Sequence, residues 1–465
     1  MLMPLVSLAV VGGLFVFLFT RSRRNPLFLS GAAAFLILGR SMFIDILPSQ
    51  SVPGVPGLLP VEMGDVVLAV VALGWLYARN RRPVPRVRLS ARWFALGVFF
   101  AYFLALELAL SLVNASGLHP MSVLETRYWF YIPCVYLVAL DVLRRFTLGE
   151  VQEYIRVLSI LTTCLAVLYI ASALNVPVYP YEKYQTIVMG STTIIRDFTT
   201  VPAWSFLAWG YFLSQSKKNA WTFAALAVLV CAQLLTYTRS AIGLMIVTMV
   251  LVAGWLMVRR GRRRHGIVVV AAGAAVAVLA LGPLTAVLPA QRDFLQSRFR
   301  GLGDLQSVLA EPNMKFRITS FETARRAGAL ADPYLGAGLF DASPEINGSQ
   351  YYNVDGDIQQ VVYRTGLVGV VVFVVPLIIA LLSTIASIAR RRLSSAAESL
   401  MLTGVVATLA CVFSFLGGSV FFWWQALALF PVALIAYATG LPAVAAAVSN
   451  PARPHHEPGR LASGL

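Results

Sequence analysis

The sequence predicts an all-α polytopic membrane protein, and three observations support that fold class. The chain of 465 residues is 58% hydrophobic and 12% charged, with a mean hydropathy of +0.75. Apolar stretches of membrane-spanning length follow one another along it. Basic residues gather in short runs between these stretches and follow no single amphipathic face. The formal net charge of +16 is therefore interpreted as a topology signal, and nucleic acid is not an expected partner.

About twelve or thirteen of the apolar stretches are predicted to span a bilayer as helices. They cover residues 3–20, 27–48, 62–78, 93–113, 128–143, 155–174, 198–215, 220–237, 240–258, 267–289, 366–388, 399–417 and 421–441. The first stretch is predicted to be retained and not cleaved, because no basic segment precedes it and Arg21, Arg23 and Arg24 follow it.

Positive charge mostly alternates from one connection to the next. Strongly basic connections occur at residues 21–24, 79–92, 144–145, 217–218, 259–264 and 390–392. The connections between them carry few cations, namely Arg127, Lys183, Arg196 and Arg239. The positive-inside rule places the basic connections in the cytoplasm and the amino terminus outside.

The chain is predicted to divide into four regions. Residues 1–289 form a transmembrane region of about ten spans, and residues 366–441 hold the carboxy-terminal transmembrane helices. Between them, residues 290–365 are charged and aromatic and too long for a linker, which predicts a folded extracytoplasmic cap. The Pro-rich residues 442–465 are predicted to be a disordered cytoplasmic tail.

The cap is predicted to be partly helical. Residues 316–330 have a helical pattern, and Pro333, Gly336 and Gly338 then impose a turn. A second helix is expected from about Gly356, leading into the span that starts at Gly366.

Neither a disulfide framework nor a metal site is predicted. The four cysteines lie in apolar runs without CxxC spacing. They are expected to be small core residues: Cys134, Cys164, Cys231 and Cys411.

Residues 238–244 read TRSAIGL, and residues 333–339 read PYLGAGL. These segments resemble the TxSRxGLL and PLxGxG elements of the O-antigen ligase and polymerase superfamily. Residues 355–360 (DGDIQQ) and 366–369 (GLVG) stand where the family has HNxYLQ and then GLxG. The resemblance covers residues 196–370 and depends on the shared order, spacing and predicted side of these motifs.

The resemblance implies a GT-C type helical glycosyltransferase at the outer face of the bacterial inner membrane. Its donor would be an undecaprenyl-diphosphate-linked oligosaccharide, and no nucleotide sugar, metal or cofactor would take part. A ligase transfers the glycan to the lipid A core, whereas a polymerase extends another lipid-linked repeat unit. Membrane lipids, a chain-length regulator and other envelope-assembly proteins are candidate partners.

The leaving diphosphate would need fixed cations, and the family match gives this role to Arg196 and Arg239. Guanidinium groups bind phosphate oxygens bidentately and stabilise the charge that develops as the bond breaks. The alternative is that both arginines only anchor helices at the interface, and Arg196 could instead pair with Asp197.

The acceptor hydroxyl would need a base. Asp355 stands where ligases have a histidine, with Asp357 in reserve. This replacement favours an O-antigen or exopolysaccharide polymerase over a ligase, with inversion at the anomeric carbon. The alternative for Asp355 is a helix cap before the apolar run.

Three further arginines are candidate substrate ligands, each with an alternative. Arg317 could pair with Glu322 or Asp332, Arg127 could pair with Glu125, and Arg364 could contact lipid headgroups.

Two other classes stay open. A flippase would line a path through the bilayer, for which Arg40 and Asp45 are the only hint, and a scaffold subunit would need none of these motifs.

Overall fold

The structure is a computed structural model of the chain. It describes residues 145–173, 185–189, 192–196, 200–215, 219–236, 239–258, 332–338, 345–346, 349–350, 357–390 and 395–417, with isolated positions within 13–28, 73–81, 101–109, 264–273 and 315–326. The tail and the other predicted spans lie outside this part or meet it at isolated positions: 3–20, 27–48, 62–78, 93–113, 128–143, 267–289 and 421–441.

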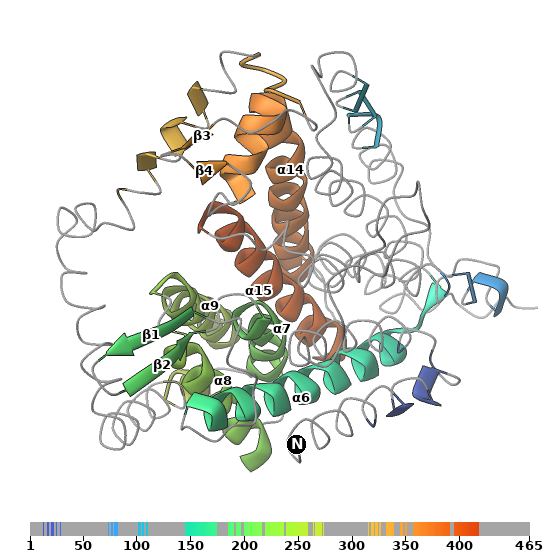
Figure 1. The fold of residues 1–465 in the computed structure, drawn as a ribbon. Coiled ribbons are helices and arrows are strands. Elements are labelled where there is room, and N and C mark those ends of the chain that lie inside the picture. The colour runs from blue at the N-terminus through green and yellow to red at the C-terminus, as the bar shows by residue number, and fades with distance from the viewer. Residues whose placement is uncertain are drawn as a thin grey trace, which may run out of the picture.

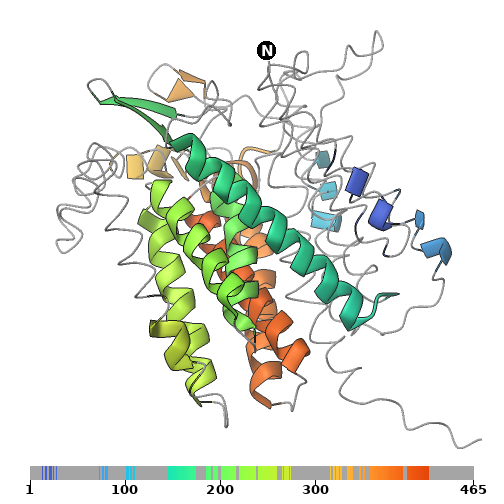
Figure 2. The same ribbon diagram turned by 90° about the horizontal axis from the view of Figure 1, so that it is seen from below.

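In the part of the chain that the structure describes, six helices pack in one bundle (Figures 1 and 2). They are α6 (Leu148–Ala173), α7 (Thr200–Ser214), α8 (Ala220–Leu235), α9 (Arg239–Val258), α14 (Asp357–Arg390) and α15 (Ser395–Gly417). Helix α7 lies at the centre and contacts α6, α8, α9 and α15, while α14 packs against α15.

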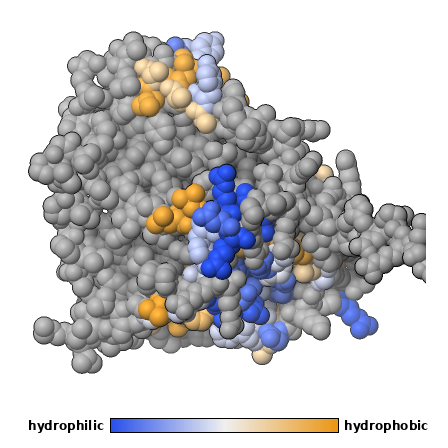
Figure 3. Space-filling model, turned by 90° about the vertical axis from the view of Figure 1, so that its right-hand side faces the viewer, coloured by the Kyte–Doolittle hydropathy of each residue, from blue (hydrophilic) through white to orange (hydrophobic). Residues whose placement is uncertain are grey.

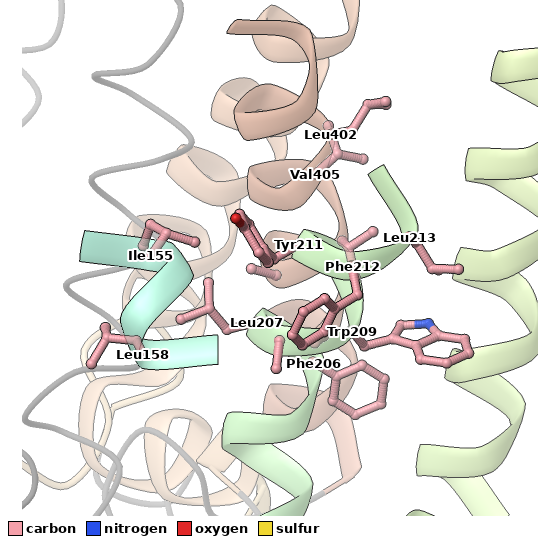
Figure 4. Close-up of a cluster of buried hydrophobic side chains, with 14 of the residues drawn as sticks. Ile155, Leu158, Phe206, Leu207, Trp209, Tyr211, Phe212, Leu213, Leu402 and Val405 are labelled. Carbon is pink, nitrogen blue, oxygen red and sulfur yellow. The ribbon is translucent and has the colours of Figure 1, made fainter. Parts of the chain in front are cut away.

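The centre of the bundle is apolar and closely packed. Figure 4 shows Phe206, Leu207 and Phe212 of α7 among side chains of α6 and α15, including Ile155 and Leu402. Gly210 of α7 brings the two backbones close, because a Cβ there would lie 2.9 Å from Val406 Cβ. Helix α7 therefore holds the other helices together.

Four predicted spans agree with helices to within a few residues: α7, α8, α9 and α15. Helix α6 differs, because it begins at Leu148 and not near residue 155. Thr147 and Glu150 form a capping box that starts it. The Thr147 N–H donates to Glu150 Oε2 at 2.8 Å, and the Glu150 N–H donates to Thr147 Oγ1 at 3.3 Å.

One helix in the described part, Leu148–Ala171, is long and apolar enough to cross a membrane by length and composition. Four others are apolar but shorter: Ala220–Leu235, Ile242–Val258, Val361–Val372 and Ser395–Ala410. The described part is thus mainly helical, with one candidate membrane-spanning helix.

Two short hairpins, which the sequence analysis does not predict, interrupt the helical pattern. Strands β1 (Gln185–Met189) and β2 (Thr192–Arg196) pair antiparallel, with Met189 opposite Thr192 and Gln185 opposite Arg196. Strands β3 (Glu345–Ile346) and β4 (Ser349–Gln350) form the second hairpin. The first one is rich in Thr, Ile and Val, and a Gly-Ser pair joins its strands in sequence, as in many two-residue hairpins.

The helix directions give the bundle two distinct ends. One end adjoins the basic residues 144–145, 217–218, 259–264 and 390–392 in the sequence, and we call it the basic end. Helices α6, α8 and α15 begin there, and α7, α9 and α14 end there. Ser214 Oγ at the end of α7 lies 3.0 Å from Ser399 Oγ near the start of α15, which shows that these termini meet. At the opposite, hairpin end, Tyr169 Oη of α6 donates to the Leu235 carbonyl at the end of α8 at 2.9 Å. The green strands β1 and β2 lie at this end in Figure 2.

Four of the predicted basic connections adjoin, in sequence, helix termini at one end of the described bundle. The pairs at 144–145, before α6, and 217–218, between α7 and α8, adjoin helix termini of the basic end. So do the runs at 259–264, after α9, and 390–392, between α14 and α15.

Candidate functional site

Helix α14 is broken at Gly366, and the break lies at the hairpin end. Gly366 has φ 58° and ψ −156°, so α14 consists of a first half at residues 357–365 and a second half from Leu367. A break of this kind removes helical partners from the carbonyls before it and from the N–H groups after it. Buried groups of either kind need other partners.

Residues 332–338, the predicted Pro-Gly turn, supply those partners. The N–H groups of Ala337 and Gly338 donate to the carbonyls of Tyr363 and Arg364, each at 2.9 Å. In return, the Val368 N–H donates to the Tyr334 carbonyl at 3.0 Å, and the Leu367 N–H donates to the Pro333 carbonyl at 3.4 Å. We call this contact the turn–helix junction.

The junction explains why glycines stand on both sides of it. Gly336 and Gly338 have φ angles of 74° and 93°, which L side chains rarely adopt. A Cβ at Gly336 would lie 2.6 Å from the Tyr363 carbonyl oxygen, and a Cβ at Gly366 would lie 2.7 Å from the Gly336 nitrogen. The two glycine motifs are therefore in contact with each other, with no room for a side chain between them.

Asp332 stabilises the turn from inside its own loop. Its Oδ1 accepts the N–H of Tyr334 at 2.7 Å and that of Leu335 at 3.0 Å. Both hydrogen bonds lower the pKa of Asp332 below its usual value of 3.8, and the bond from Leu335 has the larger effect. The Asp332 carboxylate thus accepts hydrogen bonds from backbone amides. Arg317, for which Asp332 was one of two alternative ion-pair partners, lies outside the described residues.

Arg364 lies inside the protein. Its exposed fraction is 2%, and its neighbours Tyr363 and Thr365 are buried as well. Thr365 Oγ1 donates to the Val361 carbonyl at 2.8 Å, so this buried hydroxyl has a partner within the helix. A surface contact with lipid headgroups does not fit this burial. Arg364 instead lies beside the turn–helix junction, where its own carbonyl is an acceptor.

The structure brings the backbones of Arg196 and Arg239 to the hairpin end. Arg196 is the last residue of β2, shortly before α7 begins, and Arg239 is the first residue of α9. Trp209 Nε1 of α7 donates to Thr248 Oγ1 of α9 at 3.2 Å, so these helices run together from that end. Their side-chain directions lie outside the description. The two arginines nevertheless share an end with the turn–helix junction.

The remaining candidates are only partly covered. Asp357 is the first residue of α14, with its side chain outside the description, and Asp355, Arg127 and Arg317 lie outside the described residues. The described positions between 315 and 326 are helical, as predicted, with Glu322 and Arg326 forming an exposed ion pair at 3.9 Å. Both interpretations of Asp355, as base and as helix cap, stay predictions.

At the basic end, polar side chains make contacts that were not predicted from the sequence. Arg21 Nη2 donates to Glu153 Oε1 of α6 at 2.6 Å, and Asn25 Nδ2 donates to the Glu150 carbonyl at 3.1 Å. Figure 3 looks onto the side where α6 begins, and many of the described hydrophilic residues on this face lie in a patch near its centre. The carboxylates at the start of α6, close to a basic connection, were the signal for these pairs.

No protein-family model matches the chain, and no curated protein matches it either. Within the residues that the structure describes, no three His, Cys, Asp or Glu side chains come together as a metal-binding group. The resemblance to the O-antigen superfamily therefore depends on the motifs themselves. Two of them, around Gly336 and Gly366, are the segments that form the turn–helix junction.

Proposed function

We propose that this protein is a polytopic membrane glycosyltransferase of the GT-C type. It transfers or polymerises a glycan from an undecaprenyl-diphosphate-linked donor on the outer face of the bacterial inner membrane. The favoured activity is that of an O-antigen or exopolysaccharide polymerase, and transfer to lipid A core by a ligase is the alternative. In this proposal the hairpin end faces the periplasm and the basic end faces the cytoplasm.

The turn–helix junction is the observation that carries the proposal. Its two segments, around Gly336 and around Gly366, resemble separate motifs of one family. They meet directly, because the amides of Ala337 and Gly338 bond to the carbonyls of Tyr363 and Arg364. The contact also gives Gly336 and Gly366 a physical reason.

Exposed apolar side chains support a membrane location. On α14 they recur every three or four residues along one side: Leu367, Val371, Val375, Ile378, Leu382 and Ile385. A surface helix of a soluble protein usually presents polar residues on such a side. At 1.5 Å per residue this stripe is about 27 Å long, close to the thickness of a bilayer's hydrocarbon core. The basic connections at one end agree with a fixed orientation.

The proposed reaction is a single displacement. The acceptor hydroxyl oxygen attacks the anomeric carbon, the bond from that carbon to the diphosphate oxygen breaks, and undecaprenyl diphosphate leaves with the electron pair. Arg196 and Arg239 stabilise the departing diphosphate, and Asp355 takes the hydroxyl proton. Asp357, Arg127 and Arg317 are candidate contacts for the two glycans beneath the cap.

Reconstitution tests the proposal. Purified protein in liposomes, given only a lipid-linked repeat unit, should produce longer chains and release undecaprenyl diphosphate. Transfer that occurs only after lipid A core is added would indicate the ligase. Movement of the lipid-linked glycan across the bilayer without any new glycosidic bond would indicate a flippase and would contradict the proposed enzymatic activity.

A further inference from the structure

The turn–helix junction determines the direction of the first half of α14. Residues 357–365 are joined to the bundle through Gly366, whose φ of 58° sets the angle between the two halves. The buried side chains of Val361, Tyr363 and Arg364 fix this half against the protein. Its first residue is Asp357, and Asp355 precedes it by two positions in the sequence.

We propose that the turn–helix junction is a positioning element for the acceptor-activating carboxylates. By holding residues 357–365 at one fixed angle to the rest of α14, it sets the position of the backbone of Asp357, which follows Asp355 by two residues in the sequence. Gly336, Gly366 and Asp332 are then positioning residues, which act through that segment and do not touch the substrate. This inference rests on the proposed function.

The close approach of the two backbones makes the junction sensitive to a single carbon atom. A Cβ at Gly336 would lie 2.6 Å from atoms of Tyr363, Arg364 and Gly366, so the turn would have to move away from the helix. Catalysis depends on such small distances, because a misplacement of about 1 Å far from the chemistry can reduce a rate roughly 100-fold.

The first experiment replaces Gly366 and Gly336 by alanine. In purified full-length protein we expect kcat for chain extension to fall roughly 100-fold, while KM for the lipid-linked donor changes less than about threefold. The donor site should be preserved because Arg196 and Arg239 belong to other elements. Gly254→Ala on α9 is the matched control, since no atom lies within 4 Å of a Cβ there. Wild-type kcat in both alanine variants would overturn the proposal.

A second pair of variants avoids the risk that the glycine variants do not fold. Asp332→Ala removes the acceptor for the amides of Tyr334 and Leu335, whereas Asp332→Asn keeps an oxygen at that place. We expect kcat to fall about tenfold in the first variant and to be restored in the second. A higher KM for the lipid-linked donor with unchanged kcat would contradict a positioning role. Equal activity in the two variants would contradict it as well.

Amide hydrogen exchange separates failure of this inference from failure of the proposed function. The amides of Ala337, Gly338 and Val368 should be protected in the wild-type protein and lose protection in Asp332→Ala. If the junction amides are protected but the protein forms no glycosidic bond, the proposed function fails together with any catalytic role. If they exchange as fast as free loop amides, the junction itself is wrong, whatever the activity.

Discussion

At the basic end of the described bundle, pairs of polar side chains join one element to another, whereas the hairpin end has two contacts made between backbone groups. The contacts of the basic end join helix to helix or helix to the preceding chain: Arg21 with Glu153, Ser214 with Ser399 and Thr403, and Trp255 with Glu398. The hairpin end has the β1–β2 pairing and the turn–helix junction.

The difference indicates a division of roles. Side chains that bind one another join the elements of the basic end. Bonds between backbone groups hold the strands and the turn of the hairpin end without using side chains, and this end is where the backbones of Arg196 and Arg239 lie. We therefore expect changes at the basic end to reduce stability and changes at the hairpin end to reduce transfer.

The largest effect is expected from Arg239→Ala. Removing this guanidinium should reduce chain extension roughly 100-fold or more, because the diphosphate loses a fixed cation as its bond breaks. Arg239→Lys should restore only part of the activity, since an ammonium lacks the planar fork. Arg21→Ala at the basic end is the control and should keep its activity. If the Arg239→Ala protein is present at wild-type abundance and makes normal polymer, the assignment of Arg239 to the diphosphate is wrong.

The next effect concerns stability at the basic end. Trp255 Nε1 donates to Glu398 Oε1 at 2.9 Å, and Glu398 is fully buried. Glu398→Ala leaves that donor without its acceptor and should lower the free energy of unfolding by about 1–3 kcal/mol. Glu398→Gln, which keeps an oxygen, should lose less. Thermal unfolding in detergent measures both variants, and a loss of transfer at unchanged stability would break the comparison between the two ends.

A smaller effect is expected at the capping box of α6. Thr147→Ala removes the hydroxyl that accepts the Glu150 N–H and should reduce stability by about 1 kcal/mol. Thr147→Ser keeps the hydroxyl and serves as the control. The melting temperature should fall only for alanine, with chain extension per folded molecule unchanged in both.

The smallest effect is a pH dependence at the turn. Because the pKa of Asp332 is lowered in the folded protein, its carboxylate contributes stability at neutral pH. That contribution is lost as the pH falls from the usual value of 3.8 through the folded pKa. Protection of the Tyr334 and Leu335 amides, corrected for intrinsic exchange, should decrease in that range. Asp332→Asn should show no such change, and an equal change there would exclude the carboxylate as the cause.

The helix positions were predictable because apolar runs bounded by charges define them. Four of the six helices match the predicted spans closely, and α14 begins at Asp357 and breaks at Gly366, near the predicted helix start and span start. The start of α6 was missed because its first turns are polar, with Gln152 and Glu153, although the Thr147–Glu150 spacing was a capping signal.

The junction could be predicted only in part. Pro333, Gly336 and Gly338 predict a turn from local conformational preference, and the structure has that turn. Its binding to Tyr363 and Arg364 depends on how the chain closes in three dimensions, which local preference does not determine. The hairpin of β1 and β2 was missed because a search for apolar spans passes over short strands, although its alternation and Gly-Ser turn were visible.

One measurement tests the central claim directly: an experimental structure of the full-length protein in a lipid nanodisc with bound undecaprenyl diphosphate. We predict that the diphosphate lies at the hairpin end, with the guanidinium groups of Arg196 and Arg239 both within hydrogen-bonding distance of its oxygens. A diphosphate bound at the basic end, or arginines directed toward acyl chains and away from each other, would contradict the account.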